Sequence, residues 1–193
     1  MLRANQPPAA RKPGRAGPVL AIILGLLLIA GTVTVTAVWG WQLYARQQMV
    51  YGDLRVLIRA GEGFFREYGI WPTPHSGQYG DFRYGRDFPN AYVMNILRAV
   101  SGDGNAGHSV NPGKIVFLEV RPAAPGVSGL NDAGSLLDPW GQPYQIVLDT
   151  DLDNSCQIEN SIYGTLPGYG MVVWSCGPDG ISDTEDDLCS WPR

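Results

Sequence analysis

The sequence predicts an α+β protein in which a long N-terminal helix, part membrane anchor and part stem, packs on a small antiparallel β-sheet. Three observations lead to this prediction. An uncharged aliphatic stretch near the N-terminus runs into a second helical pattern, and short strand patterns follow only after both. The turn-rich region from position 149 onward contains nine acidic residues and a single basic residue, Arg193. Helix first and strands later is the order typical of α+β folds.

The first element is a candidate membrane helix over residues 18–44. No charged residue occurs between Gly17 and Tyr44, and a span needs about 20 mostly apolar residues. The basic residues at positions 3, 11, 12 and 15 precede it without any acidic residue, which predicts a cytoplasmic N-terminus. A cleaved secretory signal is the alternative, but the apolar stretch exceeds the roughly 7 to 15 residues of a signal core.

These features divide the chain into a cytoplasmic basic segment (1–17), a transmembrane helix (18–44) and an exported globular domain (45–193). We expect a single-pass protein of the inner (cytoplasmic) membrane whose C-terminal domain is periplasmic or extracellular. The exported domain begins with a helical stem over 45–68, because apolar residues recur there at spacings of three and four. Gly69 and Pro72 then end the helix.

Shorter elements follow the stem. A short helix is expected from Asn90, and strands are expected over 114–120, 144–148 and 171–174, with turn signals such as Asp138-Pro139-Trp140-Gly141 between them. The sheet that they form would pack on the stem, which gives one small exported domain.

The C-terminal loop after the last strand, which is rich in acidic residues, predicts a Ca²⁺ site. Glycine and proline turns let oxygen atoms converge there, and Ca²⁺ takes six to eight oxygen ligands. Nearby in sequence no basic residue before Arg193 offsets the acids, so we expect a bound cation to do so. A solvated acidic loop is the alternative. We favour the metal because Cys176 and Cys189 bracket the loop and an apolar anchor, Trp191, follows it.

The chain has three cysteines, all in the exported domain, which suggests one disulfide and one remaining thiol. Cys176 with Cys189 is the preferred pair, because this bond would close the C-terminal loop. The segment 149–154 has the alternating carboxylates of the first half of an EF-hand loop. Asn154 stands where that loop needs glycine and Asn160 where it needs glutamate, so we interpret the segment as a turn, with weak Ca²⁺ binding as the alternative.

Charge and motifs exclude several functions. The chain has 18 acidic and 14 basic residues, four of the basic ones before position 17, so the rest has a formal charge of −8. A divalent cation or a basic protein surface fits this charge better than nucleic acid. An enzyme would have to use the same carboxylates, for instance as a glycosidase acid and base. No catalytic motif accompanies them, and we predict that the protein is not an enzyme.

Three segments together resemble the major pseudopilins of type II secretion and related type IV pilin-like proteins. The stem end over 54–72 is similar to the family's Tyr-Gly-x-x-Pro exit from the helix. The segment 137–144, Leu-Asp-Pro-Trp-Gly-Gln-Pro-Tyr, is close to a recognisable turn of the family. The segment 175–191 is similar to its closing Ca²⁺ loop, including the pattern from Asp187 to Trp191.

The resemblance implies a pilin-like structural subunit whose N-terminal helices bundle into a filament core, with Ca²⁺-stabilised heads outside. Its partners would be other pilin-like subunits and secretion-system membrane proteins, and the chain would form homo-oligomers if it forms filaments. Carried over by position, Asp179 and Asp187 would be Ca²⁺ ligands and Asp186 a third. Ser182 and Asp183 complete the candidate set, in a part of the loop that is shorter here than in the family.

The chain departs from the family before the apolar stretch. Pilin-type precursors carry a Gly-Phe processing site and a glutamate five residues into the mature chain. Here Gly17-Pro18 is the nearest equivalent, and no acidic residue precedes Asp53. A membrane-tethered, Ca²⁺-binding exported domain that does not polymerise is therefore the alternative function.

Overall fold

The computed structural model describes residues 16–77 and 80–192. The chain divides into two compact units, residues 1–43 and 44–193, and we describe each by itself. The expected basic residues at positions 3, 11, 12 and 15 lie outside the described residues. In the first unit the described backbone belongs to helix α1 (Ala16–Tyr68), which continues into the second unit.

The apolar stretch of α1 has the length and composition of a membrane-crossing helix. Among the residues whose side chains are described, one helix meets this test, over Ile22–Tyr68, with a mean hydropathy of 2.3 and none of its apolar window buried. Over residues 22–38 the large aliphatic side chains are exposed, from 49% at Ile23 to 72% at Leu28. A single N-terminal apolar helix of this kind fits a single-pass membrane anchor, as the sequence predicts for residues 18–44.

The second unit, which we call the head, contains the last part of α1 and an antiparallel sheet. The sheet has the order β1-β4-β7-β8. Its strands are β1 (Phe82–Tyr84), β4 (Gln145–Leu148), β7 (Met171–Ser175) and β8 (Leu188–Cys189). Two smaller antiparallel sheets pair β2 (Gly129–Leu130) with β3 (Leu136–Leu137), and β5 (Ser155–Ile158) with β6 (Gly164–Pro167). The helices besides α1 are α2 (Ala91–Leu97) and the short 3-10 turn η1 (Ala106–His108).

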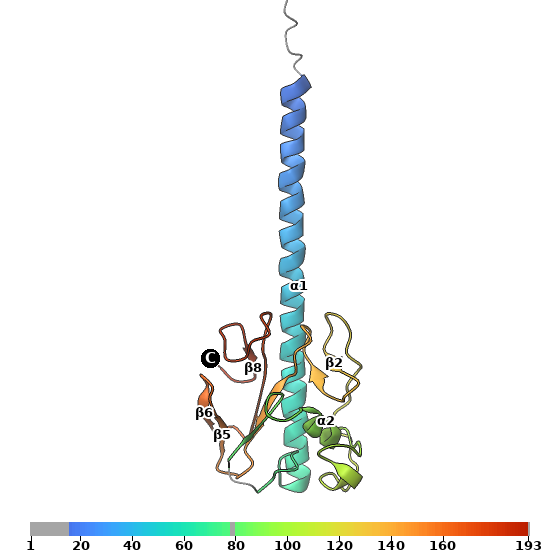
Figure 1. Cartoon of the computed structure of the whole chain (residues 1–193), viewed down its shortest axis with the longest axis vertical. Coiled ribbons are helices and arrows are strands. Elements are labelled where there is room, and N and C mark those ends of the chain that lie inside the picture. Colours follow the sequence, from blue (N-terminus) through green and yellow to red (C-terminus); the bar gives the residue numbers. More distant parts are fainter. Residues whose placement is uncertain (1–15, 78–79, 193) are drawn as a thin grey trace, which may run out of the picture. The chain divides into compact units, whose positions relative to one another are not determined.

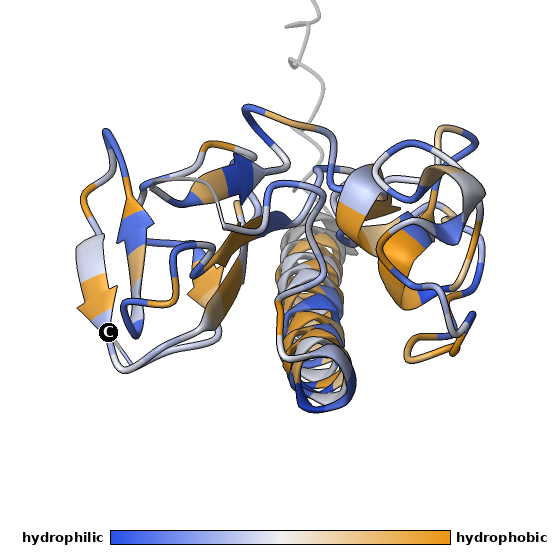
Figure 2. Cartoon of the chain, turned by 90° about the horizontal axis from the view of Figure 1, so that it is seen from below, coloured by the Kyte–Doolittle hydropathy of each residue, from blue (hydrophilic) through white to orange (hydrophobic). Residues whose placement is uncertain are grey.

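Within the head, α2 and β2 lie on one side of the stem and β5, β6 and β8 on the other (Figure 1). The stem end of α1 therefore sits between a helical side and a β side, as Figure 2 shows from below. The stem contributes Leu54, Leu57 and Phe64 to the main core. The α+β architecture, with a long N-terminal helix and small antiparallel sheets, confirms the predicted fold class.

Both faces of the central strand β4 are buried, and they face different cores. Ile146 and Leu148 belong to the main core with the stem, whereas Val147 belongs to a second core with Trp174 and Trp191. This division follows from the period-2 alternation of side chains along a strand. The second core includes Trp174 of β7 and Cys189 of β8, so it fixes the two strands that flank the C-terminal loop.

The stem ends where the sequence predicts. Helix α1 stops at Tyr68, and Gly69 has a φ of +69° while its N–H donates to Phe65 O at 2.8 Å. Glycine adopts this left-handed conformation without steric cost, so it suits the residue after a helix. The helix expected from Asn90 is also confirmed, as α2, and so are the strands expected over 144–148 and 171–174.

The strand predicted over 114–120 is wrong. The segment has no regular secondary structure, although Phe117 is half-buried and Leu118 is buried. The N–H groups of these two residues donate to Leu97 O at 2.8 and 3.1 Å. The backbone therefore closes the end of α2 instead of joining a ladder. Of the aliphatic and aromatic residues in the segment, Phe117, Leu118 and Val120 pack in or against the main core, whereas Ile115 and Val116 are exposed.

The predicted disulfide between Cys176 and Cys189 is also wrong. The three cysteines are buried, and no disulfide links them in the described part of the chain. The register of β7 and β8 explains this, because Cys189 lies opposite Trp174 and not opposite Cys176. Such diagonal neighbours are about 7 to 8 Å apart, beyond the roughly 3.5 to 4.5 Å between Cβ atoms in a disulfide.

Candidate metal centre

A buried aspartate joins the Asp-Pro-Trp-Gly turn to the base of the C-terminal loop. Asp138 is 2% exposed, and its Oδ1 accepts the N–H groups of Trp140 and Gln142, each at 2.9 Å. Its Oδ2 accepts the Ser175 hydroxyl at 2.6 Å, at the last residue of β7. Burial raises the pKa of Asp138, and these hydrogen bonds only partly offset the increase. Trp140 itself is half-buried against the main core.

The loop between β7 and β8, residues 176–187, is organised by its own carboxylates. Asp186 Oδ2 accepts the N–H of Asp179 at 3.1 Å, and its Oδ1 accepts the Thr184 hydroxyl at 2.6 Å. Partial desolvation raises the pKa of Asp186, but these hydrogen bonds lower it more, so the net pKa is below its ordinary value. Asp179 is exposed, and its Oδ1 accepts the N–H of Ile181 at 2.7 Å.

Asp187 closes the loop on its buried side. It is 4% exposed, and its Oδ2 accepts the Tyr163 hydroxyl at 2.5 Å and the Asp183 N–H at 2.8 Å. The structure thus couples the predicted ligands in two pairs, Asp179 with Asp186 and Asp183 with Asp187. All the side-chain donors that they offer are hard oxygen atoms, which is the donor set that Ca²⁺ prefers.

The expectation that only a bound cation offsets the loop is wrong in one respect, because Arg83 from β1 enters the loop. Its Nη1 lies 3.5 Å from Asp183 Oδ2, and its Nη2 donates to Ser182 Oγ at 2.5 Å. Ser182 Oγ also accepts the Trp174 indole N–H at 3.0 Å. The sequence gives no local signal for this arginine, since it precedes Ser182 by 99 positions.

The surroundings of Arg83 are largely buried. The guanidinium carbon lies 4.6 Å from the centre of the Trp174 ring, and Nε donates to Gln145 Oε1 at 3.0 Å. Burial lowers the pKa of Arg83, although the carboxylate of Asp183 acts in the opposite direction. An internal cation, Arg83, therefore faces Asp183.

A second acidic cluster has a member that sequence reasoning missed. Among the described residues, the carboxylates of Asp81, Asp149 and Asp151 form a group with ligand atoms within 4.8 Å of one another. The register Phe82↔Leu148 places Asp81 beside Asp149. Asp81 accepts the N–H groups of Thr150 at 2.9 Å and Gln157 at 2.7 Å, so it ties down the segment expected to be a turn. Burial raises the pKa of both Asp81 and Asp149.

The predicted ligand set of the C-terminal loop stays a prediction. Within the described range, three of its carboxylates do not come as close together as those of the second cluster. Asp179 and Asp186 share one end of the loop, and Asp187 lies at its buried side. A metal there would also need backbone or solvent oxygen atoms, because Ca²⁺ takes more ligands than three carboxylates supply in monodentate form.

Comparison with known proteins gives one structural similarity. No family model matches the chain, and no curated protein matches it. Among solved structures, the chain is similar to the crystal structure of the major pseudopilin from the type 2 secretion system of enterohaemorrhagic Escherichia coli, at 19% identity and a TM-score of 0.37. The match covers 79% of this chain and 92% of that chain.

Proposed function

We propose that this protein is a pilin-like structural subunit of a type II secretion pseudopilus or a related type IV filament. One observation supports this most directly: a single helix, α1, carries both an exposed apolar stretch and a stem that is buried in the head. Exposed aliphatic side chains over this length need cover from lipid or from other helices. Lipid would cover them before assembly, and equivalent helices of other copies would cover them in a filament core.

The remaining parts of the proposal follow from charge and topology. The N-terminus would be cytoplasmic, and the head would be periplasmic or extracellular. The partners would be further pilin-like subunits and secretion-system membrane proteins, with copies of this chain among them. In this proposal the carboxylates stabilise the head and carry out no catalysis.

We further propose that Ca²⁺ stabilises the head through Asp179, Asp186 and Asp187. Asp183 and Ser182 would fix the loop through Arg83, so that the ligand carboxylates are held near one another before the ion binds. When bound, the ion would offset the repulsion between these neighbouring carboxylates. The anion-rich loop is thus held from two directions, by a buried arginine and by a divalent ion.

Thermal unfolding of the full-length chain in mild detergent tests the calcium proposal. Ca²⁺ at a hundredfold excess over its dissociation constant should stabilise the native state by about 2.7 kcal/mol. Asp179→Asn should reduce the increase in Tm, because this exposed side chain makes no packing contribution that would obscure the result. Asp132→Asn is the matched control, since it removes an exposed carboxylate outside the loop. An identical Tm in Ca²⁺ and in chelator would contradict the proposal.

The non-polymerising tether is the second candidate, and the absence of the processing motif at Gly17-Pro18 favours it. Crosslinking in the membrane separates the two functions. In a filament, a cysteine introduced at Val33 in the exposed apolar stretch should link neighbouring copies into a ladder. A tether would give a monodisperse single copy in mild detergent and no ladder.

A further inference from the structure

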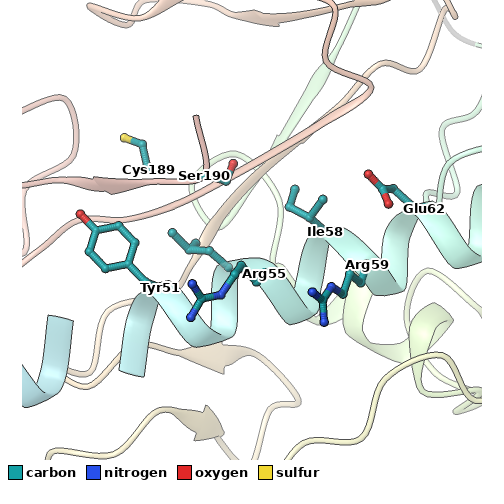
Figure 3. A pocket seen from close by; sticks show the side chains of 8 residues that line it. Tyr51, Arg55, Ile58, Arg59, Glu62, Cys189 and Ser190 are labelled. Atoms are coloured by element: carbon teal, nitrogen blue, oxygen red, sulfur yellow. The ribbon is translucent and has the colours of Figure 1, made fainter. Parts of the chain in front are cut away.

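A groove on the stem exposes two arginines that form no ion pair in the described part of the chain. The groove has a volume of about 380 Å³ and lies between α1 and β8 (Figure 3). Ile58 supplies accessible apolar surface, whereas Leu54, which also lines the groove, is only 2% exposed. Arg55 and Arg59 stand one helical turn apart along the groove, and Tyr51 and Glu62 also line it. The ion pairs of the described residues join other partners, Arg83 with Asp183 and Arg86 with Asp87.

The head also carries a surface with the opposite properties. We call residues 149–154 the acidic loop. Its members Asp149 and Asp151 crowd against Asp81, and no arginine, lysine or histidine in the described part of the chain pairs with these three. Leu152 projects between Asp151 and Asp153 and is 53% exposed. An exposed leucine flanked by carboxylates complements the part of the groove where Ile58 lies between Arg55 and Arg59.

We infer that the acidic loop of one copy docks in the stem groove of a second copy, an inference that rests on the proposed filament function. Leu152 would meet Ile58 and Tyr51, while Asp151 and Asp153 would face Arg55 and Arg59. Complementary charge of this kind fixes register and suppresses wrong partners. Arginine suits the role, because its guanidinium pairs with carboxylates in two-point geometry.

The geometry of such a contact has a direct consequence for assembly. The two surfaces are different patches of one chain, so the contact is head-to-tail. Head-to-tail contacts generate open helical filaments when their rotation does not close a ring. Each copy would use its groove for one neighbour and its acidic loop for another, which extends the filament contacts beyond the apolar helices.

Cysteine crosslinking of the full-length chain in membranes tests the contact. Copies carrying Tyr51→Cys at the groove are mixed with copies carrying Leu152→Cys, and a short bis-maleimide is added. We expect a dimer from the mixture and a ladder from the double variant, with neither from each single variant alone. The matched controls are Val56→Cys, exposed on the stem outside this groove, and Ile162→Cys, an exposed residue outside the acidic loop. If the mixture of Val56→Cys and Ile162→Cys gave as much crosslinked dimer as the mixture of Tyr51→Cys and Leu152→Cys, the inference would be overturned.

Charge reversal identifies the interaction. Arg55→Glu with Arg59→Glu should lower the yield of the Tyr51–Leu152 product about tenfold or more, because like charges would then face each other. Asp151→Arg with Asp153→Arg in the partner copy should restore the yield of this product. The yield should also fall as salt is raised, since exposed charges are screened. A yield that ignores both charge reversal and salt, or a groove cysteine that crosslinks to a different protein instead, would overturn the inference.

One further measurement separates this inference from the proposed function. The Val33→Cys ladder reports packing of the apolar helices and does not depend on the groove. If this ladder forms while the Tyr51–Leu152 product is absent, the docking contact is wrong and the filament function stands. If both are absent, the filament function fails and the docking contact fails with it.

Discussion

Replacing Arg83 with methionine tests whether an internal cation holds the C-terminal loop. The Arg83 side chain is 5% exposed and that of Asp183 is 19% exposed, so water screens their 3.5 Å ion pair only weakly. The change also removes the hydrogen bonds to Ser182 and Gln145 and the contact with the Trp174 ring. Methionine retains much of the apolar volume, so the loss reports mainly on the charged group.

The expected loss in the free energy of unfolding is about 3 kcal/mol. Removing one partner of a buried ion pair costs about 3 to 5 kcal/mol. The lower end applies here, because Asp183 keeps some contact with water and accepts a hydrogen bond from the Ser161 hydroxyl. For a head of this size, about 3 kcal/mol corresponds to a decrease in Tm of roughly 6 to 12 °C.

The assay is thermal unfolding of the full-length chain in mild detergent with chelator present, followed by tryptophan fluorescence. Arg86→Met is the matched control, because Arg86 pairs with Asp87 at 3.0 Å while both side chains are more than 40% exposed, at 42% and 47%. The free energy of unfolding lost in Arg86→Met should stay below about 1 kcal/mol. A Tm for Arg83→Met within about 2 °C of the Arg86→Met value would refute the reasoning.

The remaining predictions concern pH and packing. Burial raises the pKa of Asp138 above its ordinary value of 3.8, so its stabilising contribution is fully present below pH 3.8 and is lost as pH rises through the folded-state pKa. Asp138→Asn should therefore flatten the dependence of Tm on pH above 3.8, and unchanged slopes would count against this account. Gly170→Ala should cost about 1 to 3 kcal/mol in urea unfolding, because its Cβ would lie 2.0 Å from Cζ2 of Trp71. Gly52→Ala should instead raise stability by about 0.5 to 1 kcal/mol, because Gly52 lies within helix α1 and an added Cβ there would meet nothing within 4 Å. Equal effects at Gly170 and Gly52 would contradict the packing.

Elements with a strong local pattern could be predicted from the sequence. The stem shows helical periodicity and ends at a glycine, and β4 and β7 are β-branched runs bounded by turns. The segment 114–120 has a similar aliphatic composition, yet its N–H groups at Phe117 and Leu118 bond to the end of α2. Only Phe117, Leu118 and Val120 of this segment pack in or against the core, and such packing does not by itself distinguish a strand from an irregular segment.

Pairings between distant segments could not be predicted. The composition and spacing of the loop indicate candidate acidic ligands, which stay a prediction. The contact of Arg83 with Ser182 depends on β1 lying beside β4 in the folded sheet, and no local pattern indicates it. The same register brings Asp81 to Asp149. The Cys176–Cys189 disulfide failed for a related reason, since proximity in sequence gives no information about the offset between β7 and β8.

The buried thiols have a consequence for how the head matures. Burial raises the pKa of Cys176 to about 11, and it raises the pKa of Cys156 as well, so thiolate at these positions is scarce at neutral pH. Exchange reactions need thiolate, so oxidase and isomerase enzymes would find little to act on in the finished molecule. We expect the head to fold without forming a disulfide. It should also stay folded under reducing conditions that would unfold an exported protein whose stability depends on disulfides.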